Sequence, residues 1–170
     1  MEALHNRLLA DNQVLTWTGS VKSAKKWIKA ETLPGLVLDD DVAERTGFET
    51  IGNVAQSFVG DVYRHDANKD KGQQHAKFSF QVKTPGTYEI RIGYSPHPNR
   101  ATNVPITVHH AKGKDELVLD QTKMPSIDHL FEPVGRFLLD PERGATVEIR
   151  NDNTRGYVIL DAIQIVPVPE

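Results

Sequence analysis

Three oxygen-bearing side chains alternate in the segment RHDANKDKGQQHAKFSF, at Asp66, Asn68 and Asp70. This spacing opens many calcium-binding loops, because carboxylate and amide oxygens suit a hard cation. An EF-hand also requires glycine at its sixth position and glutamate at its twelfth, and lysine stands at both, as Lys71 and Lys77. We therefore predict a polar turn whose short side chains bond their own backbone.

A further acidic residue stands among apolar residues in the segment YVILDAIQIV. Tyr157, Ile159, Ile163 and Ile165 share the parity of Asp161, so strand alternation places its carboxylate on the core face. A buried carboxylate is costly unless it has a partner. One interpretation is that it caps backbone N–H groups or pairs with an arginine. The other is that it binds a structural calcium ion.

The calcium interpretation needs additional oxygen ligands, which the segment LVLDDDVAE supplies. On this interpretation the metal-binding residues are Asp39, Asp41 and Asp161. We expect no other cofactor within this chain.

The segment YSPHPNRATNVPITVHH concentrates side-chain donors between two prolines and a predicted strand. One interpretation is a rigid loop in which Arg100 pairs with a carboxylate such as Asp66 or Asp161. The other is a polar rim that faces a ligand, with Tyr63 or Tyr94 stacking on a sugar ring. The candidate ligand-binding residues are Tyr63, His65, Asp66, Tyr94, Asn99, Arg100 and Asn103.

Common catalytic signatures are missing from the sequence. It contains no G-x-S-x-G, P-loop or G-x-G-x-x-G motif, no H-x-x-x-H pair and no cysteine. We therefore expect that this chain is not itself an enzyme.

The elements that position these residues are short and alternating from Leu36 onward. We predict strands near 36–39, 56–63, 76–82, 87–95, 104–110, 116–120, 130–139, 145–150 and 157–166. No helical pattern of 10–15 residues separates them, which favours an antiparallel β-sandwich.

The first part of the chain differs in character. Residues 2–15 carry leucines at near-helical spacing, and a polar stretch ending in Pro-Gly follows. We therefore divide the chain into a helical lead-in and linker, residues 1–34, and a β-sandwich domain, residues 35–170. Trp17 and Trp27 both lie in the lead-in.

Bulk composition limits the partners. The chain has 170 residues and a formal net charge of −3, so no strong positive field would attract nucleic acid or an acidic membrane surface. No apolar run approaches the roughly 20 residues that span a bilayer.

Several short motifs follow one another along the sequence: a Y-x-H-D loop, a P-G-T-Y-E turn, an N-R-A-T-N-V-P run that leads to H-H-A, and a G-Y-V-I-x-D-A strand. Over about residues 35–168 the sequence resembles the golvesin/xanthan lyase C-terminal domain. Members of that family are carbohydrate-binding-like modules at the C-terminus of bacterial polysaccharide lyases, peptidases and FAD-dependent oxidoreductases. Two departures are Ala67, where relatives often carry glycine, and the strand FEPVGRFLL, which lacks a preceding tryptophan.

The resemblance implies a jelly-roll-like, galactose-binding-like sandwich that acts as a non-catalytic accessory module of a larger bacterial enzyme. The expected partners of the module are a glycan and the adjacent catalytic domain. The resemblance also favours an extracellular or periplasmic location. The alternative is a purely structural domain that packs on a FAD-dependent oxidoreductase or mediates oligomerisation, since RLLADNQVL resembles the tail of those oxidoreductases.

Overall fold

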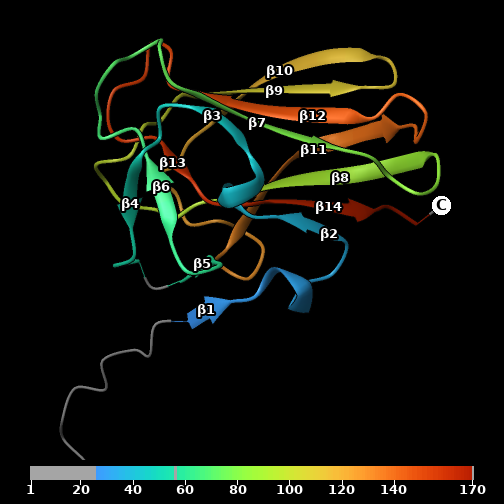
Figure 1. Cartoon of the computed structure of the whole chain (residues 1–170), viewed down its shortest axis with the longest axis horizontal. Helices are drawn as coiled ribbons and strands as arrows, with labels where there is room; N and C mark the ends of the chain where they lie inside the picture. The colour runs from blue at the N-terminus through green and yellow to red at the C-terminus, as the bar shows by residue number, and fades with distance from the viewer. Residues whose placement is uncertain (1–25, 56, 170) are drawn as a thin grey trace, which may run out of the picture.

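The computed structural model describes residues 26–55 and 57–169, and almost all of its regular structure is β-strand. Two large sheets lie face to face and form a sandwich (Figure 1). The helical lead-in expected over residues 2–15 lies outside the described residues. Within the described part, no helix is long and apolar enough to cross a membrane.

Both large sheets are antiparallel. The first contains, in spatial order, β10 (Gly113–Leu119), β9 (Val104–His110), β12 (Ala145–Arg150), β7 (His75–Phe80) and β3 (Glu44–Thr46). The second contains β11 (Phe131–Leu139), β8 (Gly86–Gly93), β14 (Ile163–Pro167) and β2 (Leu36–Leu38).

Two smaller sheets complete the sandwich. The antiparallel strands β13 (Ile159–Leu160), β6 (Tyr63–His65) and β4 (Thr50–Gly52) form one of them, at the left-hand end in Figure 1. The other consists of β1 (Lys26–Ile28) and β5 (Ser57–Val59), which pair in parallel. Two single-turn 3-10 helices, η1 (Ala30–Thr32) and η2 (Asp40–Val42), flank β2.

The core lies between the two large sheets and follows the alternation seen in the sequence. In β8, Tyr88, Ile90 and Ile92 are buried, whereas Glu89 and Arg91 between them are partly exposed. Side chains of this kind from both sheets form one apolar cluster. The predicted all-β antiparallel sandwich is confirmed.

Two predicted strands are wrong in extent, because the backbone turns within them. The strand predicted over 56–63 ends before Gly60, whose φ of 69° is easily reached only by glycine, and β6 begins after it. The strand predicted over 157–166 is interrupted at Asp161, between β13 and β14. The sequence does not predict β1, β3 or β4, because three residues are too few for an alternating pattern.

Residues 26–34 pack on the sandwich, although the sequence assigns them to a linker. Ile28 and Leu33 contact a small apolar cluster that contains Val59 and Phe131. A boundary at residue 35 therefore separates β1 from its partner β5.

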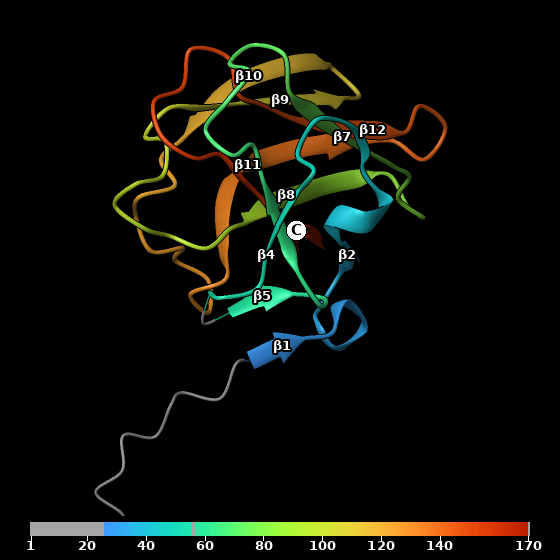
Figure 2. The same cartoon turned by 60° about the vertical axis from the view of Figure 1, so that its left-hand side comes forward.

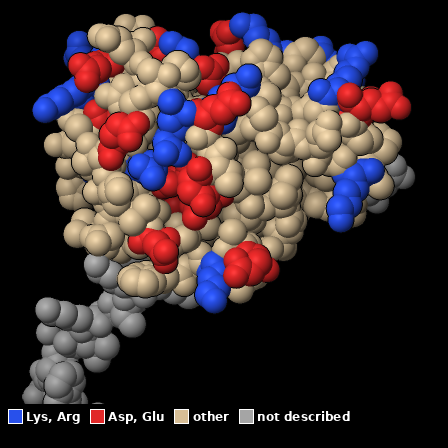
Figure 3. Space-filling view, viewed as in Figure 1, with Lys and Arg blue, Asp and Glu red and all other residues tan. Residues whose placement is uncertain are grey.

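Charged side chains of both signs are interspersed on the face of the molecule drawn in Figure 3. Among the described residues, Arg150 forms ion pairs with Glu148 and Asp152.

Candidate functional site

Three loops meet at the end of the sandwich where β4, β6 and β13 lie, and Figure 2 turns this end forward. The loops comprise residues 66–74, 96–103 and 151–158. The predicted ligand-binding residues lie in the first two loops or in the residues directly before them, so the fold brings these segments together.

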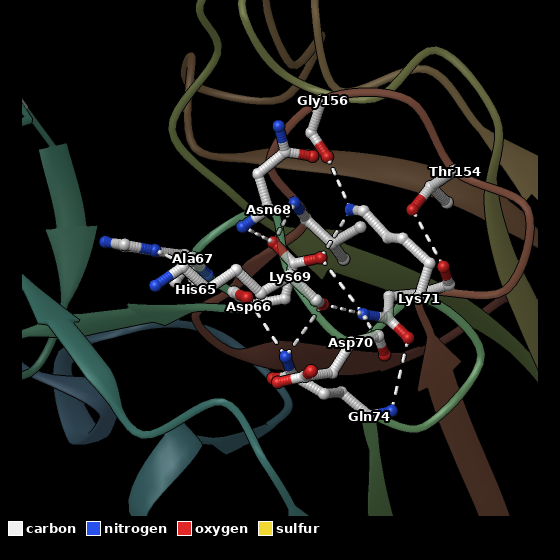
Figure 4. Close-up of polar contacts among 12 residues, drawn as sticks. His65, Asp66, Ala67, Asn68, Lys69, Asp70, Lys71, Gln74, Thr154 and Gly156 are labelled. Carbon is white, nitrogen blue, oxygen red and sulfur yellow. Dashed lines mark hydrogen bonds and ion pairs between the residues drawn. The ribbon is translucent and has the colours of Figure 1, made fainter.

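Asp66 joins the first loop to the third (Figure 4). Its carboxylate is buried and accepts hydrogen bonds from Asn68 N–H at 2.9 Å, Val158 N–H at 3.0 Å, Lys71 Nζ at 2.6 Å and Asn151 Nδ2 at 3.1 Å. The predicted polar turn, with side chains bonded to its own backbone, is confirmed. Asp66 therefore orders the loops and offers no exposed oxygen to a ligand.

The same turn holds several residues in the left-handed region. Ala67, Asn68 and Asp70 have φ values of 52°, 55° and 49°. Asparagine and aspartate tolerate this conformation, but alanine is strained in it. The strain explains why glycine suits the position of Ala67.

Backbone hydrogen bonds fix the second loop against the third. Ala101 N–H donates to Tyr157 O at 2.9 Å, and Tyr157 N–H donates to Asn99 O at 3.0 Å. Between them Gly156 has a φ of 103°, and a Cβ there would lie 2.7 Å from Asn99 O. Glycine at this position therefore allows Arg100 and Tyr157 to lie side by side.

The prediction that Arg100 pairs with a carboxylate is wrong. Its Nε donates to Ser95 O at 3.2 Å and its NH1 donates to Asn99 Oδ1 at 2.9 Å, and no described carboxylate lies within ion-pair distance. The two proposed partners are engaged elsewhere: Asp66 binds Lys71, and Asp161 faces a backbone N–H of β5.

Aromatic groups surround the Arg100 guanidinium. Its Cζ lies 5.9 Å from the centroid of the Tyr157 ring, a cation–π distance, and His65 meets the same ring edge-on at 5.4 Å. Burial lowers the pKa of Arg100, which Tyr63 and Tyr157 partly counteract. Burial, and then the positive charge of Arg100, also lower the pKa of His65, so this imidazole is neutral at pH 7.

Arg100 lines a pocket of about 330 Å³. We call it the Arg100 pocket, and its lining includes Val54, Tyr63, Ser95, His97, Arg100 and Met124. Val54 and Met124 are exposed apolar side chains at 79% and 58%, whereas Tyr63 is buried. The pocket thus combines apolar walls with a cation, an arrangement that suits binding a polar ligand with some apolar surface.

Other predicted ligand residues lie outside this pocket. The ring of Tyr94 is buried and its hydroxyl donates to the carbonyls of Asp120 and Lys123, so it cannot serve as an exposed platform. Burial raises its pKa above the usual range. Asn103 Nδ2 donates to Asn153 O at 3.0 Å and so ties the second loop to the third.

Two residues of the site are not among the predicted ones. The parity of Tyr157 indicates a core position, although the residue stands between Arg100 and His65. Ser95 lines the Arg100 pocket, and its buried hydroxyl has no hydrogen-bond partner among the described residues. No sequence signal marks a lone serine. Trp27 on β1 is 60% exposed and is not among the described residues that line this pocket.

Asp161 is buried, as its parity predicts, and its partner is a backbone group. Val59 N–H donates to its Oδ1 at 3.2 Å and to its Oδ2 at 3.3 Å. Burial raises the pKa of Asp161 well above its ordinary value, and Asp39 raises it further. The interpretation in which Asp161 accepts a backbone N–H is confirmed, and the arginine partner is not found among the described residues.

Asp39 is the nearer of the two other predicted calcium ligands. A Cβ on Gly60 would collide with Asp39 Oδ2, so this carboxylate lies against the residue that follows Val59. Asp41 is exposed. Across residues 26–55 and 57–169, no three His, Asp or Glu side chains form a group that could hold a metal ion by themselves. Calcium binding by Asp39, Asp41 and Asp161 stays a prediction.

The comparisons with known proteins agree on one family. The family model of the Golvesin C-terminal domain matches residues 39–167. Xanthan lyase of Bacillus sp. (strain GL1) is 31% identical over 142 residues, which cover 80% of this chain and 15% of that relative. The chain thus spans only a small part of the curated relative that it matches.

Solved structures show the same fold. The structure of a Paenibacillus xanthan lyase superposes with a TM-score of 0.72 at 31% identity, over 78% of this chain and 13% of that one. The CBM35 of Cellvibrio japonicus Abf62 superposes with a TM-score of 0.52 at 15% identity, over 79% of this chain and 94% of that one. A Podospora anserina GH26-CBM35 β-(1,4)-mannanase superposes with a TM-score of 0.58 at 19% identity, over 79% of this chain and 28% of that one.

The latter two similarities establish a sandwich fold shared with carbohydrate-binding modules, and the match over residues 39–167 establishes the family. The protein chain belongs to the Golvesin C-terminal domain family, as the order of the motifs in its loops and strands predicts.

Proposed function

We propose that this chain is a non-catalytic accessory module of a larger enzyme and that it binds carbohydrate in the Arg100 pocket. The fold shared with CBM35 modules and the membership of the Golvesin C-terminal domain family support an accessory role. The observation that carries the proposal is the Arg100 guanidinium, which lies against Tyr157 in a pocket and has no described carboxylate partner.

The chemistry of the pocket matches that of a sugar ring. A sugar presents C–H groups that pack on apolar side chains and hydroxyl groups that need directed hydrogen bonds. Val54 and Met124 supply the first kind of surface, and Arg100 and Ser95 supply groups for the second.

The larger protein is proposed from its relatives. Xanthan lyase, the curated relative at 31% identity, is much longer than this chain, which covers 15% of it. We infer that the chain adjoins a catalytic domain that acts on a polysaccharide. None of the relatives described above is a FAD-dependent oxidoreductase, so that association stays a prediction.

A glycan array tests the proposal. The purified chain, with and without calcium, should bind at least one glycan, and Arg100→Ala should weaken that binding by about tenfold or more, as expected when a charged hydrogen-bonding group is removed. Arg143→Ala is the matched control, because Arg143 is exposed and its side chain donates one hydrogen bond, to the carbonyl of Ala111, among the described residues. A folded parent that binds no glycan would overturn the proposal.

A further inference from the structure

The charges around the Arg100 pocket narrow the class of ligand. Its described lining includes Arg100, His97 and His129 and no acidic residue, in a chain whose net charge is −3. A neighbouring hollow at the same end, which His65 lines, has a mixed set of charges instead: Glu49, Asp66, Lys69 and Asp70. The absence of carboxylates therefore distinguishes the Arg100 pocket from the hollow beside it.

Arg100 has hydrogen-bonding capacity to spare. A guanidinium has five N–H donors, and hydrogen bonds to Ser95 O and Asn99 Oδ1 use two of them. The group is partly buried, so it has lost water without gaining a counter-ion among the described residues. Removing a cation from water is unfavourable, and an anionic group that enters the pocket would compensate for it.

The Ser95 side chain adds a second unused group. Ser95 lines the same pocket, and its Oγ is buried with no hydrogen-bond partner in the described part of the chain. Buried hydroxyl groups in folded proteins nearly always have a partner. Rotation of the Ser95 side chain toward the pocket would let an oxygen of a ligand bound at Arg100 become that partner.

From this geometry we infer that the Arg100 pocket selects a sugar that carries a carboxylate, such as a uronic acid. The carboxylate binds Arg100, and the sugar ring packs beside Val54 and Met124. This inference rests on the proposed function and deepens it, because it names the substrate class of the same site.

A sugar carboxylate fits this pocket better than a free inorganic anion does. Two carboxylate oxygens match the edge of a single guanidinium, which gives a bidentate pair. The remaining polar groups are few, and Val54 and Met124 provide apolar surface. A sugar acid needs both features, whereas a free inorganic anion needs only the charge.

The test compares matched sugars that differ only at the acidic group. The folded parent chain is titrated with methyl glucuronide, galacturonide and mannuronide and with the corresponding neutral methyl glycosides, and binding is followed by amide chemical shifts in NMR. The chain is also titrated with sodium acetate, sodium sulfate and the 6-sulfate of methyl glucoside, which would reveal a general or a sulfate anion site. The variants are Arg100→Gln and, as the control, Arg143→Gln.

We expect at least one acidic sugar to bind about tenfold more tightly than its neutral partner, the contribution of one charge-assisted hydrogen bond. Arg100→Gln should abolish this preference while keeping the thermal transition and the residual affinity for the neutral sugar, and Arg143→Gln should keep the preference.

Equal affinity for acidic and neutral sugars would overturn this inference and leave the proposed function standing. Binding of acetate or sulfate as tight as that of the sugar acids, or tighter binding of the sulfated sugar, would also overturn it, since the site would then be a general or a sulfate anion site. Absence of binding to every sugar in the titration and to every glycan on the array would overturn the proposed function itself.

Discussion

Asp66 and Asp161 are both buried carboxylates, but the protein compensates them differently. Asp66 accepts four hydrogen bonds, one of them from the ammonium group of Lys71. Asp161 accepts one backbone N–H and lies near a second carboxylate, that of Asp39. Removing the charge should therefore have opposite effects at the two positions.

At Asp66, the change Asp66→Asn should destabilise the fold by about 3 kcal/mol, because it leaves the partly buried ammonium of Lys71 and the buried amide of Asn151 without their anion. Chemical denaturation measures the loss. The control is Glu116→Gln, which disrupts the solvent-exposed pair of Lys114 and Glu116 and should leave stability unchanged. An Asp66→Asn variant as stable as the parent would show that Asp66 does not hold the loops together.

At Asp161, Asp161→Asn should stabilise the protein by about 1 kcal/mol at pH 8 in chelator, because the amide oxygen still accepts from Val59 N–H while repulsion by Asp39 is removed. Thermal melts in chelator and in excess calcium measure this effect and also show whether the carboxylates bind a calcium ion. If calcium binds between the carboxylates, calcium should stabilise the parent and not the variant. Identical parent melts in the two buffers would reject the ion. Strong destabilisation of Asp161→Asn in chelator would mean that the buried charge is itself stabilising, contrary to its single backbone partner.

The pH dependence of stability follows from the same pair. Burial, together with neighbouring carboxylates, raises the pKa of Asp39 to about 7, against about 3.9 in an unfolded chain. The folded state then binds more protons than the unfolded state between these values, so the contribution is present at low pH and is lost as the pH rises toward 7. In chelator, the parent should become less stable from pH 5 to pH 8, and Asp39→Asn should flatten this trend. If the stability of the parent instead rises from pH 5 to pH 8, and the stability of Asp39→Asn changes in the same way, the raised pKa of Asp39 would be contradicted.

The strain at Ala67 gives a further prediction. Left-handed φ costs a non-glycine residue roughly 1–2 kcal/mol, so Ala67→Gly should raise the free energy of unfolding by about 1 kcal/mol once the extra entropy of the unfolded chain is subtracted. Ala67→Val should lower it, since β-branched residues fit this region poorly. Denaturation midpoints that rank Val above Gly would mean that the turn relaxes to another conformation.

Among the elements, long strands and short strands differ in how well the sequence predicts them. β9 (104–110) and β12 (145–150) have the predicted bounds, because their alternation runs over six or seven residues. The three-residue strands and the breaks at Gly60 and Asp161 depend on pairing with distant segments, such as β1 with β5. Such pairings have no local signal, so local periodicity cannot reveal them.

Strand β1 can be tested by comparing chains that start at residue 26 and at residue 35. The shorter chain loses the pairing with β5 and the packing of Ile28 and Leu33, which should cost about 2–4 kcal/mol for two partly buried side chains. It should still melt cooperatively, because the main apolar cluster lies between the large sheets. Equal stability of the two chains would show that β1 adds nothing, and loss of the transition would place it in the core.

For the whole molecule, the sequence identifies the fold and the site-bearing loops but not the partners within them. The N-R-A-T-N segment does carry the central residue, Arg100. Its surroundings could not be predicted, because Tyr157 reaches it from a distant loop and Ser95 contacts it only where the segment between them folds back. Asp66 and Tyr94 are candidate ligand residues from their residue types alone. Both are buried in the structure, so their roles are structural.

The central claim is that a glycan binds at the Arg100 pocket, and chemical-shift mapping tests it most directly. The best glycan from the array is added to the isotopically labelled chain, and each perturbed amide is located in the structure. We predict that the largest changes cluster at Ser57, Ser95, Arg100 and Tyr157, and that Arg100→Gln removes them. Changes confined to the edge strand β10, or to the hollow lined by His65, with Arg100 unperturbed, would contradict the claim.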